Sequence, residues 1–128
     1  MAEAVVVTGD RAAPWRILVY GSDAMRRRSV ARAFAAHRIT VLLASTLAET
    51  AKCVRDGALH AAVLLDGIAV LHAVHEAQPS LHVLWAGAVS PDALPAAWYD
   101  VLHTTGHALD ADAIVRATLR CLDAIRRP

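Results

Sequence analysis

Short apolar runs of strand length alternate along most of this chain with longer segments whose apolar residues recur at helical spacing. The pattern predicts strands over 17–20, 39–43, 60–65, 81–86 and 100–103. It predicts helices over 24–37, 46–57 and 68–77, and a last helix that begins at Asp110. Strands that alternate with helices in this way favour right-handed crossovers and parallel pairing. We therefore expect a three-layer, doubly wound α/β domain with a five-stranded parallel sheet in the order 2-1-3-4-5.

The chain of 128 residues is long enough for one domain with one core. Residues 15–128 are assigned to that domain. Residues 1–14, which hold only the short run Val5–Val7 before a polar stretch, are predicted to form a flexible N-terminal arm. Within the domain, Thr46 and Glu49 have the spacing of a capping box at a helix start. Gly57 is expected to end that helix in the left-handed conformation.

Composition restricts the class of protein. The apolar fraction is 56%, but no run approaches the roughly 18 residues that a membrane span needs. The N-terminus has no basic cluster typical of a secretory signal. Cys53 and Cys121 are two cysteines on predicted helices that do not form a disulfide framework, and they are expected to pack as small apolar side chains. The formal net charge of +1 provides no general attraction to nucleic acid or membrane. We expect a soluble, cytoplasmic protein.

Asp66 is the main candidate for chemistry, since it directly follows the most apolar predicted strand and precedes Gly67. Open α/β sheets place their ligands at the carboxyl ends of the strands. Few polar groups are expected to join Asp66 there. The first predicted strand is followed by Gly21, Ser22 and Asp23, and the fourth ends at Gly87 between two alanines.

The order and spacing of these units resemble the receiver domain of bacterial two-component response regulators, which has a flavodoxin-like fold. The resemblance covers about residues 16–127, and its best local match is the segment 17–27. Asp66 then stands at the family's phosphoacceptor position, with Gly21 and Ser22 at the position of its metal-binding acidic pair. Gly87 stands where the family has a Ser or Thr hydroxyl, and the segment around Thr104 lacks the family's Lys-Pro.

These departures imply a degenerate site, because phosphoryl transfer depends on positioning and charge stabilisation. Asp66 and the displaced Asp23 form a poor magnesium site, and no cofactor is expected. Ser22 and Asp23 also suit the cap of the first helix. Asp66 is therefore interpreted as an inherited, idle carboxylate. The alternative is a competent phosphoacceptor that receives its phosphoryl group from a histidine kinase.

The other polar clusters in the sequence have simpler interpretations than a binding site. His72 and His75 with Glu76, and His103 with His107, offer too few ligands for zinc. The basic run Arg26, Arg27, Arg28 and Arg32 lacks interleaved aromatic residues, so a solvated helix face or a protein contact is favoured over nucleic-acid binding.

We expect a degenerate, stand-alone receiver-like domain, not an enzyme, that signals by protein–protein contact as a homodimer or with another partner. The prolines at 91 and 95 shorten the helix before Trp98, so Leu94, Trp98 and Tyr99 are candidate interface residues. The alternative for these aromatic residues is core packing. A second alternative for the whole chain is a small α/β protein that binds an unrelated ligand.

Overall fold

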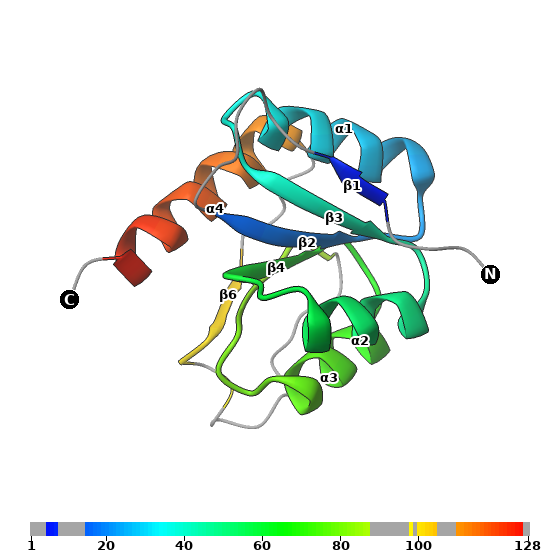
Figure 1. Ribbon diagram of the computed structural model, residues 1–128. Helices are drawn as coiled ribbons and strands as arrows, with labels where there is room; N and C mark the ends of the chain where they lie inside the picture. The colour runs from blue at the N-terminus through cyan, green and yellow to red at the C-terminus, as the bar shows by residue number, and fades with distance from the viewer. Residues whose placement is uncertain (1–4, 8–14, 88–97, 99, 105–109, 127–128) are drawn as a thin grey trace.

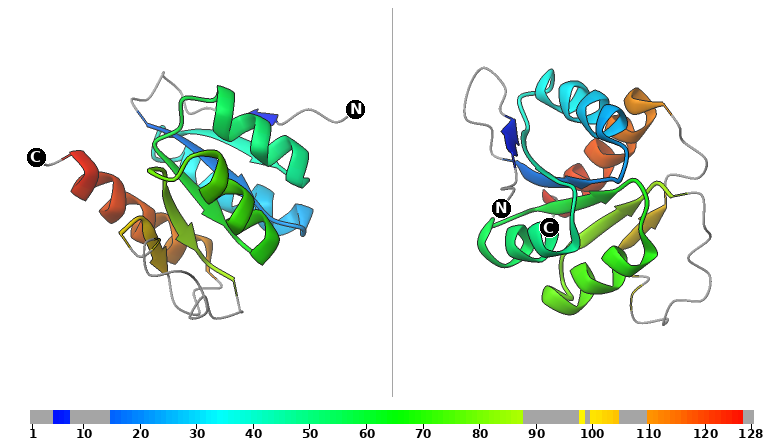
Figure 2. Two further views of the ribbon diagram at one scale, coloured as in Figure 1. Left: turned by 90° about the horizontal axis from the view of Figure 1, so that it is seen from below. Right: turned by 90° about the vertical axis from the view of Figure 1, so that its right-hand side faces the viewer.

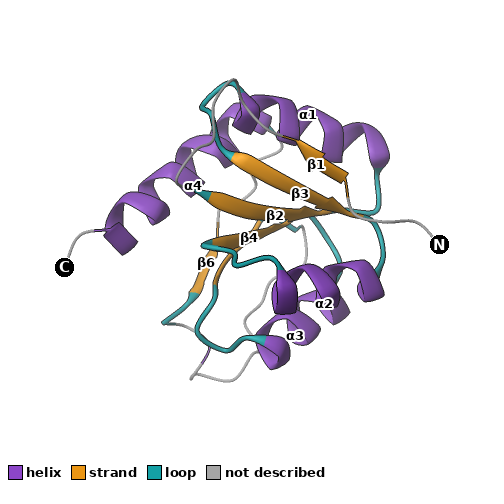
Figure 3. Cartoon of the chain, in the orientation of Figure 1, coloured by secondary structure: helices purple, strands orange, loops and turns teal. Residues whose placement is uncertain are grey.

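The computed structural model describes residues 5–7, 15–87, 98, 100–104 and 110–126. Five parallel strands form the centre of the fold (Figures 1 and 3). They are β2 (Arg16–Tyr20), β3 (Thr40–Ala44), β4 (Ala61–Leu64), β5 (His82–Trp85) and β6 (Leu102–Thr104). Their spatial order is β3-β2-β4-β5-β6, which confirms the predicted order 2-1-3-4-5.

A further strand lies at the edge of this sheet. β1 (Val5–Val7) pairs antiparallel with β3, so that Val6 is opposite Leu42. The sequence had placed this valine run in a flexible arm outside the domain. In the structure it forms a sixth strand, because β3 has an unpaired edge and three β-branched residues suit a short strand there.

In the described part of the chain, four helices cover the two faces of the sheet, and Figure 2 shows them on opposite sides. α1 (Ala24–Ala35) and α4 (Ala111–Arg126) pack on one face, and α2 (Leu47–Asp56) and α3 (Ile68–Ala77) on the other. The strand residues alternate between these two layers: Leu18 faces α2 and α3, whereas Ile17 and Val19 face α1 and α4. None of the described helices has both the length and the apolar character needed to cross a membrane.

The start of α2 confirms the expected cap. The Thr46 hydroxyl accepts a hydrogen bond from the Glu49 N–H at 3.1 Å. In a standard capping box the carboxylate accepts from the N–H of the N-cap residue. Here the Glu49 carboxylate instead accepts from the N–H of the preceding residue, Ser45, at 3.2 Å.

The expectation for the end of α2 was wrong. Gly57 is right-handed, with φ −86°, and the next residue, Ala58, takes the left-handed conformation at φ 49°. Glycine is required at 57 for space, because a Cβ atom there would lie 2.4 Å from the Cys53 carbonyl oxygen.

Candidate functional site

The carboxyl ends of β2 and β4 bring Ser22 and Asp66 together. The two strands are parallel neighbours with Tyr20 opposite Leu64, so the residues that follow them emerge side by side. The Ser22 hydroxyl donates to Asp66 Oδ2 at 2.7 Å, and the Ser22 N–H lies 3.1 Å from Oδ1 and 3.3 Å from Oδ2. The predicted juxtaposition of these two residues is therefore confirmed. Both Asp66 oxygens accept hydrogen bonds from a single residue.

The backbone after Asp66 turns sharply into α3. Gly67 has φ 86° and occupies the N-cap position of the helix without a side-chain cap. A Cβ atom there would also lie 3.0 Å from the Tyr20 ring. Glycine meets both requirements, since it adopts positive φ at little cost. After this tight turn, Asp66 is half-buried at the carboxyl edge of the sheet.

Asp23 faces its own helix. Its Oδ1 atom accepts hydrogen bonds from the Met25 N–H at 2.9 Å and the Arg26 N–H at 3.4 Å, which makes it the N-cap of α1. The sequence had offered both Ser22 and Asp23 as caps. The structure divides the two roles: Asp23 caps the helix, and Ser22 binds Asp66. Of the two magnesium candidates, Asp23 thus has a structural role that needs no ion.

Two arginine side chains from α1 lie at the same edge. Arg26 Nη1 donates to the Leu65 carbonyl oxygen at 3.2 Å, and Arg27 Nη1 donates to the Gly21 carbonyl oxygen. Arg26 Nη2 is buried and has no hydrogen-bond partner among the described residues. Part of the basic run on α1 is therefore used within the fold, beside Asp66. Arg28 and Arg32 remain exposed.

Gly21 and Gly87 lie in crowded surroundings. A Cβ atom at 21 would lie 3.0 Å from Leu65 Cδ1 and 3.3 Å from Arg27 Cγ. A Cβ atom at 87 would lie 2.3 Å from Cζ2 of the buried Trp85 indole. Neighbouring side chains crowd both positions, tightly at Gly21 and with a direct clash at Gly87.

The remaining predicted residues lie elsewhere. Thr104 is exposed at the end of β6, where it pairs in register with Trp85. Trp98 is half-buried at the border of the α2 and α3 layer. Its indole contacts the rings of His72 and His75, with centroids 4.7 Å and 4.1 Å away.

Trp98 is therefore partly packed and partly accessible, and the two histidines cover it. Leu94 and Tyr99, the other interface candidates, lie outside the described residues, as does His107.

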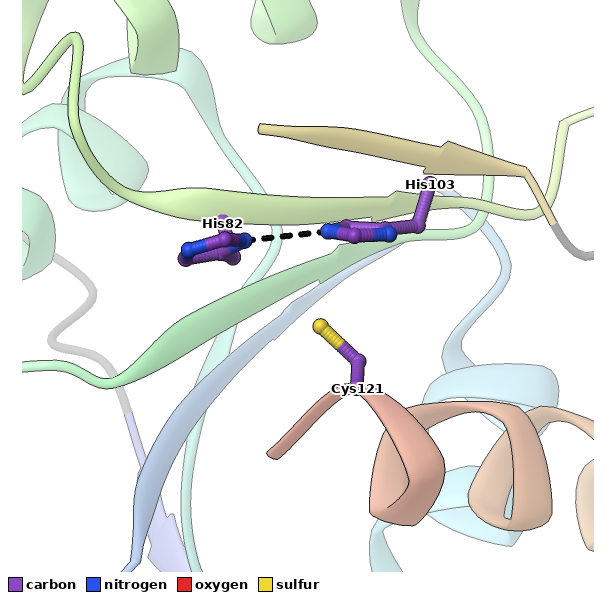
Figure 4. A group of neighbouring side chains, drawn as sticks. All are labelled: His82, His103 and Cys121. Carbon is purple, nitrogen blue, oxygen red and sulfur yellow. Dashed lines mark hydrogen bonds between the residues drawn. The ribbon is translucent and has the colours of Figure 1, made fainter. Parts of the chain in front are cut away.

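A second polar group was not found from the sequence. His82, His103 and Cys121 come together between β5, β6 and α4, as Figure 4 shows. His82 Nδ1 lies 3.0 Å from His103 Nε2. Burial, together with the nearby His82, lowers the pKa of His103, and burial raises the pKa of the Cys121 thiol.

The sequence signal for this cluster is weak. His82 opens an otherwise apolar strand, and Cys121 is a single thiol on a distant helix. Only the pairing of β5 with β6 beneath α4 reveals that these side chains meet. Cys121 and Cys53 are both free and buried, in opposite layers of the fold, so they cannot form a disulfide with each other.

No protein-family model matches this sequence, and no curated protein is significantly similar to it in sequence. The likeness to known proteins is found in three dimensions.

A response regulator receiver protein from Sinorhizobium medicae superposes with a TM-score of 0.64 at 15% identity, over 86% of this chain and 95% of the other. A CheY-like receiver domain protein from Methanospirillum hungatei gives a TM-score of 0.66 at 12% identity, over 88% and 96% of the two chains. A receiver domain protein from Clostridium thermocellum gives 0.66 at 14% identity, over 88% and 97%. The chain therefore has the fold of response-regulator receiver domains, as the resemblance implied.

Proposed function

We propose that this chain is a degenerate receiver-like domain of bacterial signal transduction that works by protein–protein contact, without efficient phosphorylation of Asp66 and without enzymatic activity. The observation that carries the proposal is the close packing at Gly21 and Gly87. A Cβ atom at Gly21 would make tight contacts with Leu65 and Arg27, and one at Gly87 would clash with the Trp85 indole, so little room is left for larger side chains at these positions. This packing supports the proposal that the receiver-like fold is kept without a working phosphorylation site.

The charge around Asp66 supports the same proposal. A phosphoacceptor needs cationic or metal stabilisation of the transferred group. Asp66 accepts from a neutral serine, and Arg26 Nη1 donates to the Leu65 carbonyl oxygen. Magnesium usually binds one or two protein carboxylates together with phosphate oxygens. Asp66 would have to act without Asp23, whose carboxylate caps α1.

The partner is proposed to be a protein: a second copy of this chain or another signalling protein. The half-buried Trp98 lies near β6, beside a segment whose sequence holds two prolines. Amphipathic aromatic residues in such positions frequently anchor interfaces. Two free, buried cysteines are in keeping with a cytoplasmic location.

Phosphorylation tests the proposal directly. The full chain is incubated with magnesium and a small phosphodonor, and intact-protein mass spectrometry follows the addition of one phosphoryl group. We expect no addition, for the wild type and for Asp66→Asn alike. A competent receiver domain assayed in the same tube serves as the positive control for the donor.

The alternative is a competent phosphoacceptor that receives its phosphoryl group from a histidine kinase. Stoichiometric labelling of the wild type that is lost in Asp66→Asn would establish this alternative and refute the proposal. Labelling that persists in Asp66→Asn would instead place the reactive group elsewhere and leave Asp66 idle, as proposed.

A further inference from the structure

Three side chains that commonly bind transition metals meet beside β5 and β6, the last two strands of the chain. His103 in β6 is paired with Leu84 in β5, and His82 lies two positions before Leu84, so both imidazoles project from the same face. That face is covered by α4, which contributes Cys121 (Figure 4). Each of the three donors therefore comes from a different element, and the tertiary fold brings them together.

The distances are close to those of a coordination site. The two facing ring nitrogens are 3.0 Å apart, and the three donor atoms all lie within 4.8 Å of one another. Bond lengths of about 2.0–2.1 Å to nitrogen and about 2.3 Å to sulfur, at tetrahedral angles, place two nitrogens about 3.3 Å apart and nitrogen and sulfur about 3.6 Å apart. The nitrogens nearly satisfy this geometry already, and the thiol needs to approach by only about 1 Å.

The protonation state of His103 also suits a cation. A metal-binding imidazole must be neutral, and burial and the neighbouring His82 lower the pKa of His103. The Cys121 thiol is buried, which raises its pKa, so it holds its proton in the free protein. Binding a cation would release that proton to solvent and leave a thiolate ligand, as in other cysteine-containing sites.

We propose that His82, His103 and Cys121 form a binding site for a borderline transition-metal cation, with Zn²⁺ as the probe ion. Two imidazoles and one thiolate are ligands that zinc accepts, and they leave a fourth position for water or an added ligand. The proposal is independent of phosphorylation at Asp66, which follows the carboxyl end of β4, whereas His82 begins β5 and His103 lies in the middle of β6. An ion bound here would tie the edge strand β6 to α4.

A simpler explanation is that the two histidines only bond to each other. One neutral ring then donates its N–H to the other, and Cys121 serves as an apolar side chain in the core beneath them. The two explanations differ in the role of the sulfur atom. In the hydrogen-bonded pair the thiol is not needed, whereas in the metal site it is a ligand.

Cobalt substitution shows by absorbance whether the sulfur atom of Cys121 is a metal ligand. The reduced full chain, freed of metal with a chelator, is titrated with Co²⁺ while absorbance is recorded, and Zn²⁺ is then added as a competitor. We expect one equivalent of Co²⁺ to bind, with a thiolate-to-cobalt charge-transfer band and the intense visible bands of a four-coordinate ion. Zn²⁺ should displace the cobalt and raise the thermal unfolding temperature, because a ligand that binds only the folded state stabilises it.

Variants locate the site. Cys121→Ser should abolish the charge-transfer band, and His103→Ala should weaken Zn²⁺ affinity by at least about 100-fold, more than the 10–100-fold typical of lost outer-shell partners. Cys53→Ala and His72→Ala are the matched controls, one buried thiol and one exposed imidazole outside the cluster. Both controls should bind like the wild type.

Circular dichroism confirms that each variant is folded. If a cluster variant is not folded, carbethoxylation of the wild-type histidines, with and without Zn²⁺, replaces it and should show His82 and His103 protected.

Three outcomes would overturn the proposal. The first is that the wild type binds no Co²⁺ or Zn²⁺ at micromolar concentrations. The second is binding without a charge-transfer band, and the third is binding that Cys121→Ser and His103→Ala leave unchanged. The last two results would assign the ion to surface histidines and leave the His82–His103 pair as a hydrogen bond only. None of these outcomes bears on whether Asp66 is phosphorylated, so the two proposals fail separately.

Discussion

The indole of Trp85 lies where a side chain at position 87 would have to be. A Cβ atom at Gly87 would be 2.3 Å from Cζ2 and 2.6 Å from Cε2 of this ring, which is itself 2% exposed. Trp85 is the last residue of β5 and Gly87 follows two positions later, so the size of the side chain at each position limits the size allowed at the other. A large ring at 85 is compatible only with glycine at 87, unless the ring moves.

Gly87→Ser is therefore expected to destabilise the fold by about 1–3 kcal/mol, the usual cost of overpacking a core. The measurement is the free energy of unfolding from urea titration. The control is the same substitution in a Trp85→Ala background, where the clash no longer exists and the added cost of serine should fall to nearly zero. Equal costs in both backgrounds would show that the ring does not restrict position 87.

Substitutions at Asp23 distinguish a role in helix capping from a role in metal binding. Asp23→Ala should lower stability by about 1 kcal/mol, because the Met25 and Arg26 N–H groups lose their acceptor. Asp23→Asn should have almost no effect, since asparagine caps as well as aspartate. Thermal unfolding with and without magnesium is the measurement. A magnesium-dependent gain in stability that Asp23→Asn removes would show that the carboxylate binds the ion.

The Glu49 cap should respond to acid. Partial burial alone would raise the pKa of this carboxyl, but hydrogen bonds from Ser45 and Thr46 outweigh it and lower the pKa below its ordinary range. A carboxyl whose pKa is lower in the folded state binds protons more readily when unfolded. Its contribution to stability is therefore complete above the unfolded pKa and declines as pH falls through the folded value.

Glu49→Gln keeps the hydrogen-bond acceptor but cannot titrate, so the wild type should be the more stable protein near neutral pH. The difference in unfolding free energy between the two proteins should shrink as the pH is lowered through the acidic range. A difference that stays constant with pH would mean that the charge of Glu49 has no part in the cap.

Trp98 is expected to anchor association. Trp98→Ala should weaken self-association or partner binding by about 2 kcal/mol while the far-ultraviolet circular dichroism stays unchanged. Sedimentation velocity over a range of concentrations measures the effect. His72→Ala is the control, since it removes a ring that contacts Trp98 and leaves the indole in place. If the wild type stays monomeric at every concentration and binds no protein partner through Trp98, the role of this residue is limited to packing within its own domain.

The five parallel strands were predictable from the sequence because each forms an apolar run between helical segments. β4, whose residues Ala61–Leu64 are all buried, is the clearest example. The meeting of Ser22 with Asp66 followed from the same pattern, since neighbouring parallel strands end together. Long-range relationships were not predictable. Val5–Val7 could be assigned to the sheet only once the free edge of β3 was known, and the spacing of His82, His103 and Cys121 along the chain carries no sign of their contact.

The two outermost strands of the described sheet have only three residues each. β1 covers the edge of β3, and β6 forms the opposite edge. An uncovered strand of five apolar and β-branched residues such as β3 presents unpaired N–H and C=O groups on which another chain can add a strand. The pairing of Val5–Val7 with β3 occupies these groups along part of that edge. A chain shortened to begin at Trp15 would keep the entire receiver-like core and still be expected to precipitate or to form β-rich assemblies.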